Sequence, residues 1–345
     1  MPQVATLRES RTPGQVGVGR KAAEAIVRPL LGGLVLLLTL IGLIGTAIKN
    51  PQPHDIQVGL VGPAPAIEQI SGAFESKAPG AFQFTSYGSV DAAQAAIDAR
   101  SVDGVVVLGA ADPRLILAGA AGDAVTGVIT GALTNAFRAQ GRAVTVETVH
   151  PFASGDAHGL ILFFVVLAVV ISTLVAQALV GLRNDTGLGV RLVMVAVYGC
   201  LASLVGMGTA AWLADGYGSG FWTATGLVGL ASAAIGAVVA GSARLLGTAG
   251  VGLAALIVVL LDLVASGGPI GSQLLPDFYR WLAPAMPAGQ LYSALRGALY
   301  FDNAGLGMPI AVLCAWLAGG LVLMVLGELV ARRSRARVPQ LDRAQ

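Results

Sequence analysis

Six long apolar segments limit what this chain can fold into. One segment comes first, roughly a hundred residues of mixed sequence follow it, and five more apolar segments come after that. About twenty apolar residues in a helix cross a hydrocarbon layer of about 30 Å, because a helix rises about 1.5 Å per residue. The sequence therefore predicts a polytopic α-helical membrane protein with six transmembrane helices, at residues 29–48, 159–182, 192–214, 221–241, 248–267 and 308–331.

The positions of arginine and lysine predict the orientation. They cluster in the N-terminal segment 1–28, in the connection 183–191 and in the tail 332–345. Because positive residues beside membrane helices remain in the cytoplasm, we expect both termini to be cytoplasmic and residues 49–157 to be extracellular. The expected location is the plasma membrane, with the lipid bilayer as partner. The net charge of +2 belongs mostly to the tails, so no nucleic-acid partner is expected.

Residues 49–157 are expected to form a small extracellular α/β domain between helices 1 and 2. Strand-like and helix-like patterns alternate through this stretch. Strands are predicted at 55–62, 81–87, 102–108, 115–119 and 144–150, and helices at 64–76, 90–99 and 124–140. The remaining five helices form a transmembrane domain over 158–331.

The sequence offers little for catalysis. It contains no phosphate-binding G-x-x-x-x-G-K-[ST] loop, and its two cysteines, Cys200 and Cys314, both lie in apolar segments. His150, Asp156 and His158 are spaced either as a metal cluster or as a polar linker into the second helix. We expect no enzyme activity, no catalytic residue, no cofactor and no metal site.

The connection between the fifth and sixth helices is distinctive. Prolines at 276, 284 and 287 divide it, and leucines at 291, 295 and 299 recur at helical spacing. We predict interfacial short helices at 269–301. Phe278, Tyr279 and Trp281 are expected to form an aromatic surface at the membrane boundary, where tyrosine and tryptophan are favoured.

Short motifs in this connection resemble the outer loop of type-2 ABC exporter permeases, especially YhgE/Pip-like actinobacterial membrane proteins. The motifs are Ser266-Gly267-Gly268, Leu275-Pro276, Pro287-Ala288-Gly289, Leu295-Arg296 and Tyr300-Phe301. The stretches VDAAQAAIDARSVDGVVVL and HPFASGDAHGL are also similar to that family. The resemblance implies an export permease with a separate ATP-binding subunit as a possible partner. In such permeases a helix between the second and third spans docks the ATPase, whereas the connection here, 183–191, is short and contains glycine.

Asp262 is an ionisable residue within the fifth apolar segment. Such residues are costly in a membrane and commonly face a cavity or a partner. One interpretation is a contact for substrate or proton near the outer mouth. The other is a water-exposed carboxylate, paired with Arg280 or Arg296. The fourth segment has Ser232, Gly236 and Ala240 at small-xxx-small spacing, which is compatible with a sliding interface or with static packing.

Two functions are compatible with these patterns. The first is the permease subunit of an exporter, a homodimer that moves an amphiphilic or lipid-like compound outward with energy from a separate ATPase or an ion gradient. Its substrate pathway or outer gate is expected to include Asp262, Phe278, Tyr279, Trp281 and Arg296. The alternative is a non-transporting receptor, or a scaffold for envelope assembly or secretion, that acts through the extracellular domain.

Overall fold

The computed structural model describes residues 13–109, 112–183 and 185–337. Six of its helices are long and apolar enough to cross a membrane, as in a multi-pass membrane protein. They are the six predicted segments, although the third begins at Leu188 and the fourth ends at Leu246, each several residues beyond its predicted limit. The chain divides after Thr46 into two compact units.

The described part of the first unit is helix α1 up to Thr46, and the helix runs without interruption from Pro13 to Ile48. Its apolar part, Leu30–Ile48, agrees with the predicted first span. Two threonine hydroxyls in this part donate hydrogen bonds within the helix. Thr39 donates to the Val35 carbonyl at 2.8 Å, and Thr46 donates to the Gly42 carbonyl at 2.7 Å. A polar side chain satisfied in this way is tolerated in an apolar environment.

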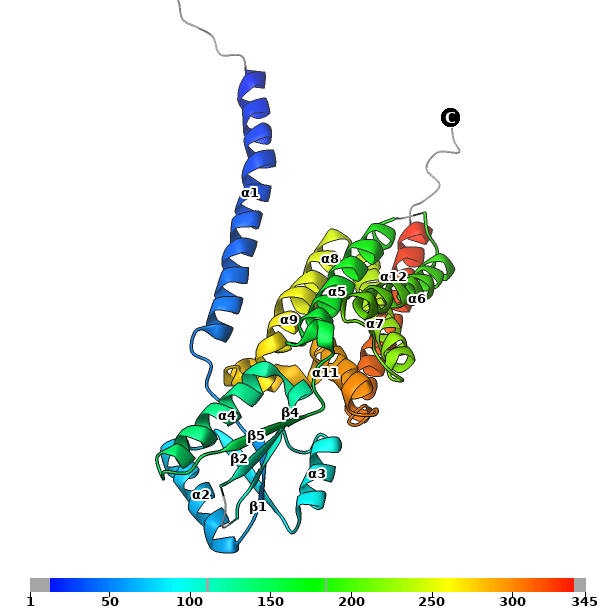
Figure 1. Cartoon of the computed structure of the whole chain (residues 1–345). Coiled ribbons are helices and arrows are strands. Elements are labelled where there is room, and N and C mark those ends of the chain that lie inside the picture. Colours follow the sequence, from blue (N-terminus) through cyan, green and yellow to red (C-terminus); the bar gives the residue numbers. More distant parts are fainter. Residues whose placement is uncertain (1–12, 110–111, 184, 338–345) are drawn as a thin grey trace, which may run out of the picture. The chain divides into compact units, whose positions relative to one another are not determined.

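The second unit begins with a small α/β domain (Figure 1). Its sheet has the strand order β2–β1–β3–β4–β5, in which only β3 and β4 pair antiparallel. The strands are β1 (Ile56–Val61), β2 (Phe82–Tyr87), β3 (Gly104–Val107), β4 (Arg114–Ala118) and β5 (Thr145–Val149). The helices are α2 (Ala64–Lys77), α3 (Val90–Asp98) and α4 (Asp123–Arg138), with short 3₁₀ turns at Gly119–Ala121 and Ser154–Asp156. Every boundary lies within two residues of its prediction.

The two faces of the sheet have separate apolar cores. Helices α2 and α4 cover one face, where Ile56, Leu60 and Ile129 are fully buried. Helix α3 covers the other face. Each core also contains one residue from the distant connection 266–305: Leu274 in the first and Phe301 in the second. The α/β domain is therefore completed by the chain that follows the fifth span.

The remaining spans form a bundle around one central helix. Its members are α5 (Leu160–Gly181), α6 (Leu188–Leu213), α7 (Phe221–Leu246), α12 (Gly307–Arg337) and a composite fifth span. That span joins α8 (Thr248–Ala255), a π-helical segment (Leu256–Leu261) and α9 (Asp262–Ala265). Helix α7 contacts α5, α6, α8 and α12, and most of its side chains are buried.

Small residues allow α7 to approach its neighbours closely. A Cβ added at Gly236 would lie 3.1 Å from Cγ of Gln177 on α5. Ser232 and Thr173 share a hydrogen bond of 2.9 Å between the same two helices. These contacts confirm that the small residues of α7 form a helix interface. Sliding of α7 against α5 at this interface stays a prediction, beside static packing.

The connection after α9 turns sharply before it returns to α12. Gly267 has a φ of +70°, and an added Cβ would lie 2.5 Å from the carbonyl carbon of Gly271, so only glycine fits there. Short 3₁₀ turns follow at Gly268–Ile270, Ser272–Leu274 and Ala283–Ala285. Between them lie α10 (Asp277–Leu282) and α11 (Pro287–Tyr300). Helix α11 is more than an interfacial helix, because Leu291 and Leu295 are fully buried in the bundle core.

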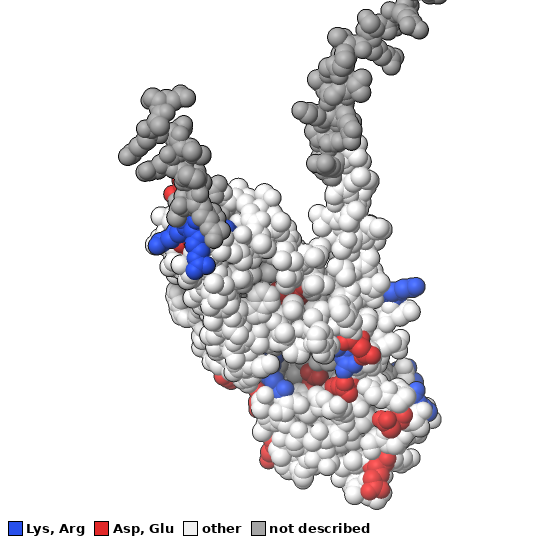
Figure 2. Space-filling view, turned by 180° about the vertical axis from the view of Figure 1, so that it is seen from behind, with Lys and Arg blue, Asp and Glu red and all other residues white. Residues whose placement is uncertain are grey.

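The surface of the second unit separates into zones of different charge. Figure 2 shows a helical surface almost without charged residues, a basic group near the C-terminal tail, and mixed charges beside the α/β domain. Large apolar side chains are exposed on the bundle helices α5 and α6, including Phe164, Leu201 and Val205. An apolar belt between two charged ends is typical of helices that contact lipid.

Candidate functional site

Asp262 is buried and anchors α11. Its side chain is fully enclosed, and both carboxylate oxygens accept the backbone N–H of Ala288 at 2.9 Å. Ala288 lies in the first turn of α11, where unpaired N–H groups and the helix dipole favour a negative charge. The interpretation of Asp262 as a water-exposed carboxylate paired with an arginine is therefore wrong. Its two predicted partners are engaged elsewhere.

The aromatic residues of α10 point in different directions. Phe278 is 56% exposed and Trp281 is 77% exposed, whereas Tyr279 is only 4% exposed. The Phe278 and Tyr279 rings meet edge to face at 5.3 Å. The predicted exposure is confirmed for Phe278 and Trp281 and is wrong for Tyr279, and the location at a membrane boundary stays a prediction. A helix of six residues cannot place three such closely spaced side chains on one face, since successive residues are turned by about 100°.

Arg296, on α11, reaches the α/β domain. Its Nη1 donates hydrogen bonds to the carbonyls of Ala121 and Ala120, the latter at 3.5 Å. The guanidinium also lies over the Tyr292 ring, with Cζ 4.9 Å from the ring centroid. Arg296 therefore joins α11 to the turn that precedes α4.

Arg100, which the sequence analysis did not identify, extends from the α/β domain to α11 and the residues that follow it. It follows α3 in the left-handed backbone region, with a φ of 59°. Nη1 bonds to the carbonyls of Ser293 at 3.0 Å and Ala304 at 3.3 Å, and Nη2 bonds to Ser293 Oγ at 3.0 Å. No local pattern distinguishes an arginine at the end of a helix from a solvent-exposed one, so only the tertiary structure identifies it.

A third arginine, Arg280, closes the same junction through ion pairs. Arg280 of α10 bonds to Asp55, directly before β1, and to Asp277 at 3.0 Å. The backbone N–H of His54 donates to the Gln273 carbonyl at 2.9 Å. Together with Arg100 and Arg296, these contacts hold the α/β domain against α10 and α11.

A cavity of about 450 Å³, here called the junction cavity, lies between these contacts. Its lining is mostly polar and comes from both sides of the junction. The charged and polar side chains include His54, Asp55, Arg100, Asp103, Ser266, Gln273, Arg280, Gln290, Tyr292, Ser293 and Arg296. Of the predicted site residues, only Arg296 lines this cavity.

The junction cavity perturbs its ionisable groups. Burial, together with the nearby charge of Arg296, lowers the pKa of Arg100 to about 10. Burial also raises the pKa of Asp103 above its ordinary value, although Arg296 and Arg100 partly oppose this shift. Both shifts indicate a region of low dielectric in which positive charges lie close together.

A second cavity is apolar. It is a groove of about 560 Å³ between α5 and α6, and only Ser172, Tyr198 and Thr209 contribute polar groups to its lining. It offers a surface that a lipid tail can contact.

Of the two interpretations of His150, Asp156 and His158, the metal cluster does not form. His150 bonds to Asp98 at 2.8 Å, His158 bonds to Asp123, and Asp156 accepts the N–H of Ile161 at 3.0 Å. Within the residues that the structure describes, no group of three or more His, Cys, Asp or Glu side chains is arranged to hold a metal ion.

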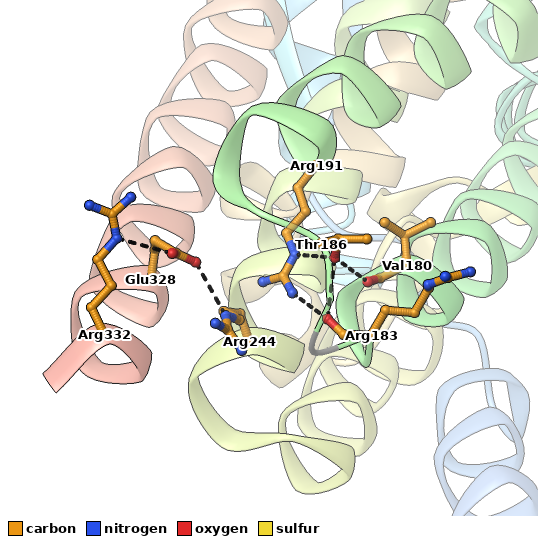
Figure 3. A network of polar contacts seen from close by, with 7 residues as sticks. All are labelled: Val180, Arg183, Thr186, Arg191, Arg244, Glu328 and Arg332. Carbon is orange, nitrogen blue, oxygen red and sulfur yellow. Dashed lines mark hydrogen bonds and ion pairs between the residues drawn. The ribbon is translucent and has the colours of Figure 1, made fainter. Parts of the chain in front are cut away.

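The opposite end of the bundle has its own polar network (Figure 3). Arg191 is 1% exposed and donates to the Arg183 carbonyl at 2.7 Å and to Thr186 Oγ1 at 3.2 Å, which fixes the connection between α5 and α6. Glu328 of α12 pairs with Arg244 of α7 at 3.4 Å and with Arg332 at 3.1 Å. Among the described residues of the α5–α6 connection, 182–183 and 185–187, none is helical.

Comparisons of the chain with protein-family models, with curated proteins and with solved structures find no match.

Proposed function

We propose that this protein is the permease subunit of an exporter and that it moves an amphiphilic or lipid-like compound outward across the plasma membrane. The observation that favours this function most is the junction cavity, which places polar and charged groups at one end of an apolar helical bundle. Helix α10 adds an amphiphilic element, because Arg280 lines the cavity while Phe278 and Trp281 are exposed. In this proposal a homodimer works with a separate ATPase or an ion gradient.

The proposal requires a definite topology, with both termini cytoplasmic and the α/β domain outside. Replacing Cys200 and Cys314 by Ala gives a background for labelling single introduced cysteines. A cysteine at Ser86, which is exposed on β2, is expected to react with an impermeant maleimide on intact cells. A cysteine at Ser334 in the C-terminal part of α12 is expected to react only after the cells are opened. Labelling in the reverse pattern would contradict the proposed orientation.

Transport is tested with the full chain in liposomes. We expect the protein to move a fluorescent short-chain phospholipid between leaflets under an imposed ion gradient, or with a co-purified ATPase and ATP. Chemical quenching of the outer leaflet measures the rate. Trp281→Ala should slow this movement several-fold, because it removes the exposed aromatic ring beside the cavity.

Trp212→Ala is the matched control. Trp212 is also 77% exposed, but its helix α6 contributes no residue to the junction cavity, whereas α10 contributes Arg280. Equal slowing by both variants would show that exposed tryptophans matter only for contact with lipid. Movement no faster than in protein-free liposomes, with every energy source, would contradict export.

A receptor or scaffold is the second candidate, favoured by the α5–α6 connection. A helix that docks an ATPase is expected between these spans, and the described residues of that connection form none. Arg191 also fixes this connection through buried hydrogen bonds. Purification in mild detergent followed by mass spectrometry separates the candidates: a stoichiometric ATPase supports export, whereas envelope proteins without an ATPase support the scaffold.

A further inference from the structure

We infer that the junction cavity binds a phosphate group between Arg296 and Arg100, and that this phosphate belongs to the polar head of the amphiphile. The inference rests on the proposed function, because it names the chemistry of the compound that is moved. It depends on the charges, the unpaired atoms and the size of the cavity.

The charges of the cavity favour an anion. Three arginines line it, against two aspartates. One of the arginines, Arg280, is already paired with Asp55 and Asp277. Arg100 and Arg296 therefore share only Asp103, and neither forms a salt bridge with it in the described residues.

Arg100 and Arg296, which have no salt bridge in the described residues, also repel each other. The charge of Arg296 is one reason why the pKa of Arg100 falls to about 10, the larger reason being burial. An anion placed between the two guanidinium groups would offset their repulsion and raise the pKa of Arg100 again, because an opposite charge stabilises the protonated form. Arginine suits phosphate in particular, since its planar donors match two phosphate oxygens at once.

Two nitrogen atoms of cavity-lining residues lack a partner. Arg296 uses Nη1 for the carbonyls of Ala120 and Ala121, and its Nε is buried without a hydrogen bond. Nδ1 of His54 is likewise buried and unpaired. The Arg296 Nε–H is a donor, and His54 Nδ1 is a donor in one of the two tautomers of its ring. An unpaired buried donor is costly, so this site gains more from a ligand rich in acceptors than a satisfied site would.

The size of the cavity fits a lipid head better than a bare ion. Its volume of about 450 Å³ lies within the range of roughly 300–1,000 Å³ that is usual for sites of small organic ligands. Arg280 and Pro284 line the cavity, and the adjacent Trp281 is exposed to the surroundings of the bundle. A phosphate head in the cavity with its chains along α10 would match both surfaces.

Binding is measured by titration calorimetry on the full chain in a neutral maltoside detergent. The probes are dihexanoyl phosphatidic acid, glycerol 3-phosphate, inorganic phosphate and, as the uncharged match, dihexanoyl glycerol. We expect saturable binding of the phosphatidic acid at one molecule per chain, weaker binding of the two soluble phosphates, and none of dihexanoyl glycerol. Soluble phosphates that bind as tightly as the lipid would overturn the lipid assignment.

Arg296→Gln should weaken binding of the phosphatidic acid by at least about tenfold, the loss expected when a charged hydrogen-bond donor is removed. The matched control is Arg114→Gln, which removes an exposed arginine paired with Glu147 on the same domain, and it should leave binding unchanged. Asp103→Asn removes the opposing carboxylate and keeps both arginines, so it should tighten binding several-fold. This variant gives a result even if Arg296→Gln does not fold.

Failure of the inference and failure of the proposed function give different results. Absence of saturable binding to any phosphate probe, or binding that Arg296→Gln and Asp103→Asn leave unchanged, overturns the phosphate site even where lipid transport is measured. Binding that follows the expected pattern in a protein without transport supports the site and contradicts the exporter. In that case the cavity belongs to a receptor for phosphorylated amphiphiles.

Discussion

Replacing Phe301 by Ala is expected to lower the free energy of unfolding of the α/β domain by about 3–5 kcal/mol, the usual cost of removing a buried phenylalanine. Phe301 is 3% exposed and belongs to the core under α3, although it lies more than 140 residues beyond the last strand. Its ring packs against the His150 ring at 4.8 Å and beneath Arg100, whose Cζ is 5.4 Å from the ring centroid. The substitution therefore removes both the packing of the ring in the core and the aromatic face over which Arg100 lies.

Chemical denaturation in detergent measures this loss, and hydrogen exchange of the amides in β3 and β4 locates it. Phe278→Ala is the matched control, because Phe278 lies in the same connection but is 56% exposed. A surface substitution of this kind usually changes stability by less than about 0.5 kcal/mol. If Phe301→Ala left exchange in β3 unchanged, the domain would fold without the connection, and the shared core described above would not hold in solution.

The secondary structure of the α/β domain could be predicted because its patterns are local. Ser89 illustrates this: its Oγ accepts the Ala92 N–H at 3.1 Å and starts α3 where the sequence indicates a helix. Strand β3, with the run Gly104–Val107, is likewise recognisable from its β-branched residues alone. The six apolar helices are equally evident, since length and hydropathy determine them.

The junction could not be predicted, because its contacts join parts of the chain that lie far apart. Arg100 and Ser293 are 193 residues apart, and Arg296 and Ala121 are 175 apart. Leu274 and Phe301 have nothing in their local sequence that assigns them to a soluble core rather than to a membrane interface. The prediction that Tyr279 lies at the surface is wrong for the same reason. It relies on the aromatic composition of the segment, whereas tertiary packing buries the side chain.

The connection 266–305 thus combines two kinds of surface that sequence patterns do not separate. Its motifs predict an outer gate, and Phe278 and Trp281 within it are exposed. Another part supplies core residues to the α/β domain through Leu274 and Phe301. In the proposed exporter, a movement of α10 and α11 would therefore be transmitted to the sheet, and the α/β domain would take part in transport.

Asp262→Asn is expected to lower the free energy of unfolding by about 1–3 kcal/mol, the usual cost of leaving a buried hydrogen-bonding group unsatisfied. The carboxylate presents two acceptor oxygens to the Ala288 N–H at the start of α11. Asparagine keeps one acceptor and turns an NH₂ donor toward that same N–H, in a position with no exposure to water.

This result distinguishes an anchor from a contact for substrate or proton. If Asp262 anchors α11, Asp262→Asn should lower the thermal midpoint of the full chain, and phosphate binding and transport should fall with it, because Arg296 lies on the same helix. The matched control is Asp277→Asn in the first turn of α10, whose side chain is 89% exposed and whose loss should cost less than about 1 kcal/mol. An Asp262→Asn protein with an unchanged thermal midpoint but no transport would contradict the anchor and restore the substrate or proton contact. We expect the midpoint and the transport rate to fall together, since a buried carboxylate whose oxygens both accept a backbone N–H has its main interaction within the protein itself.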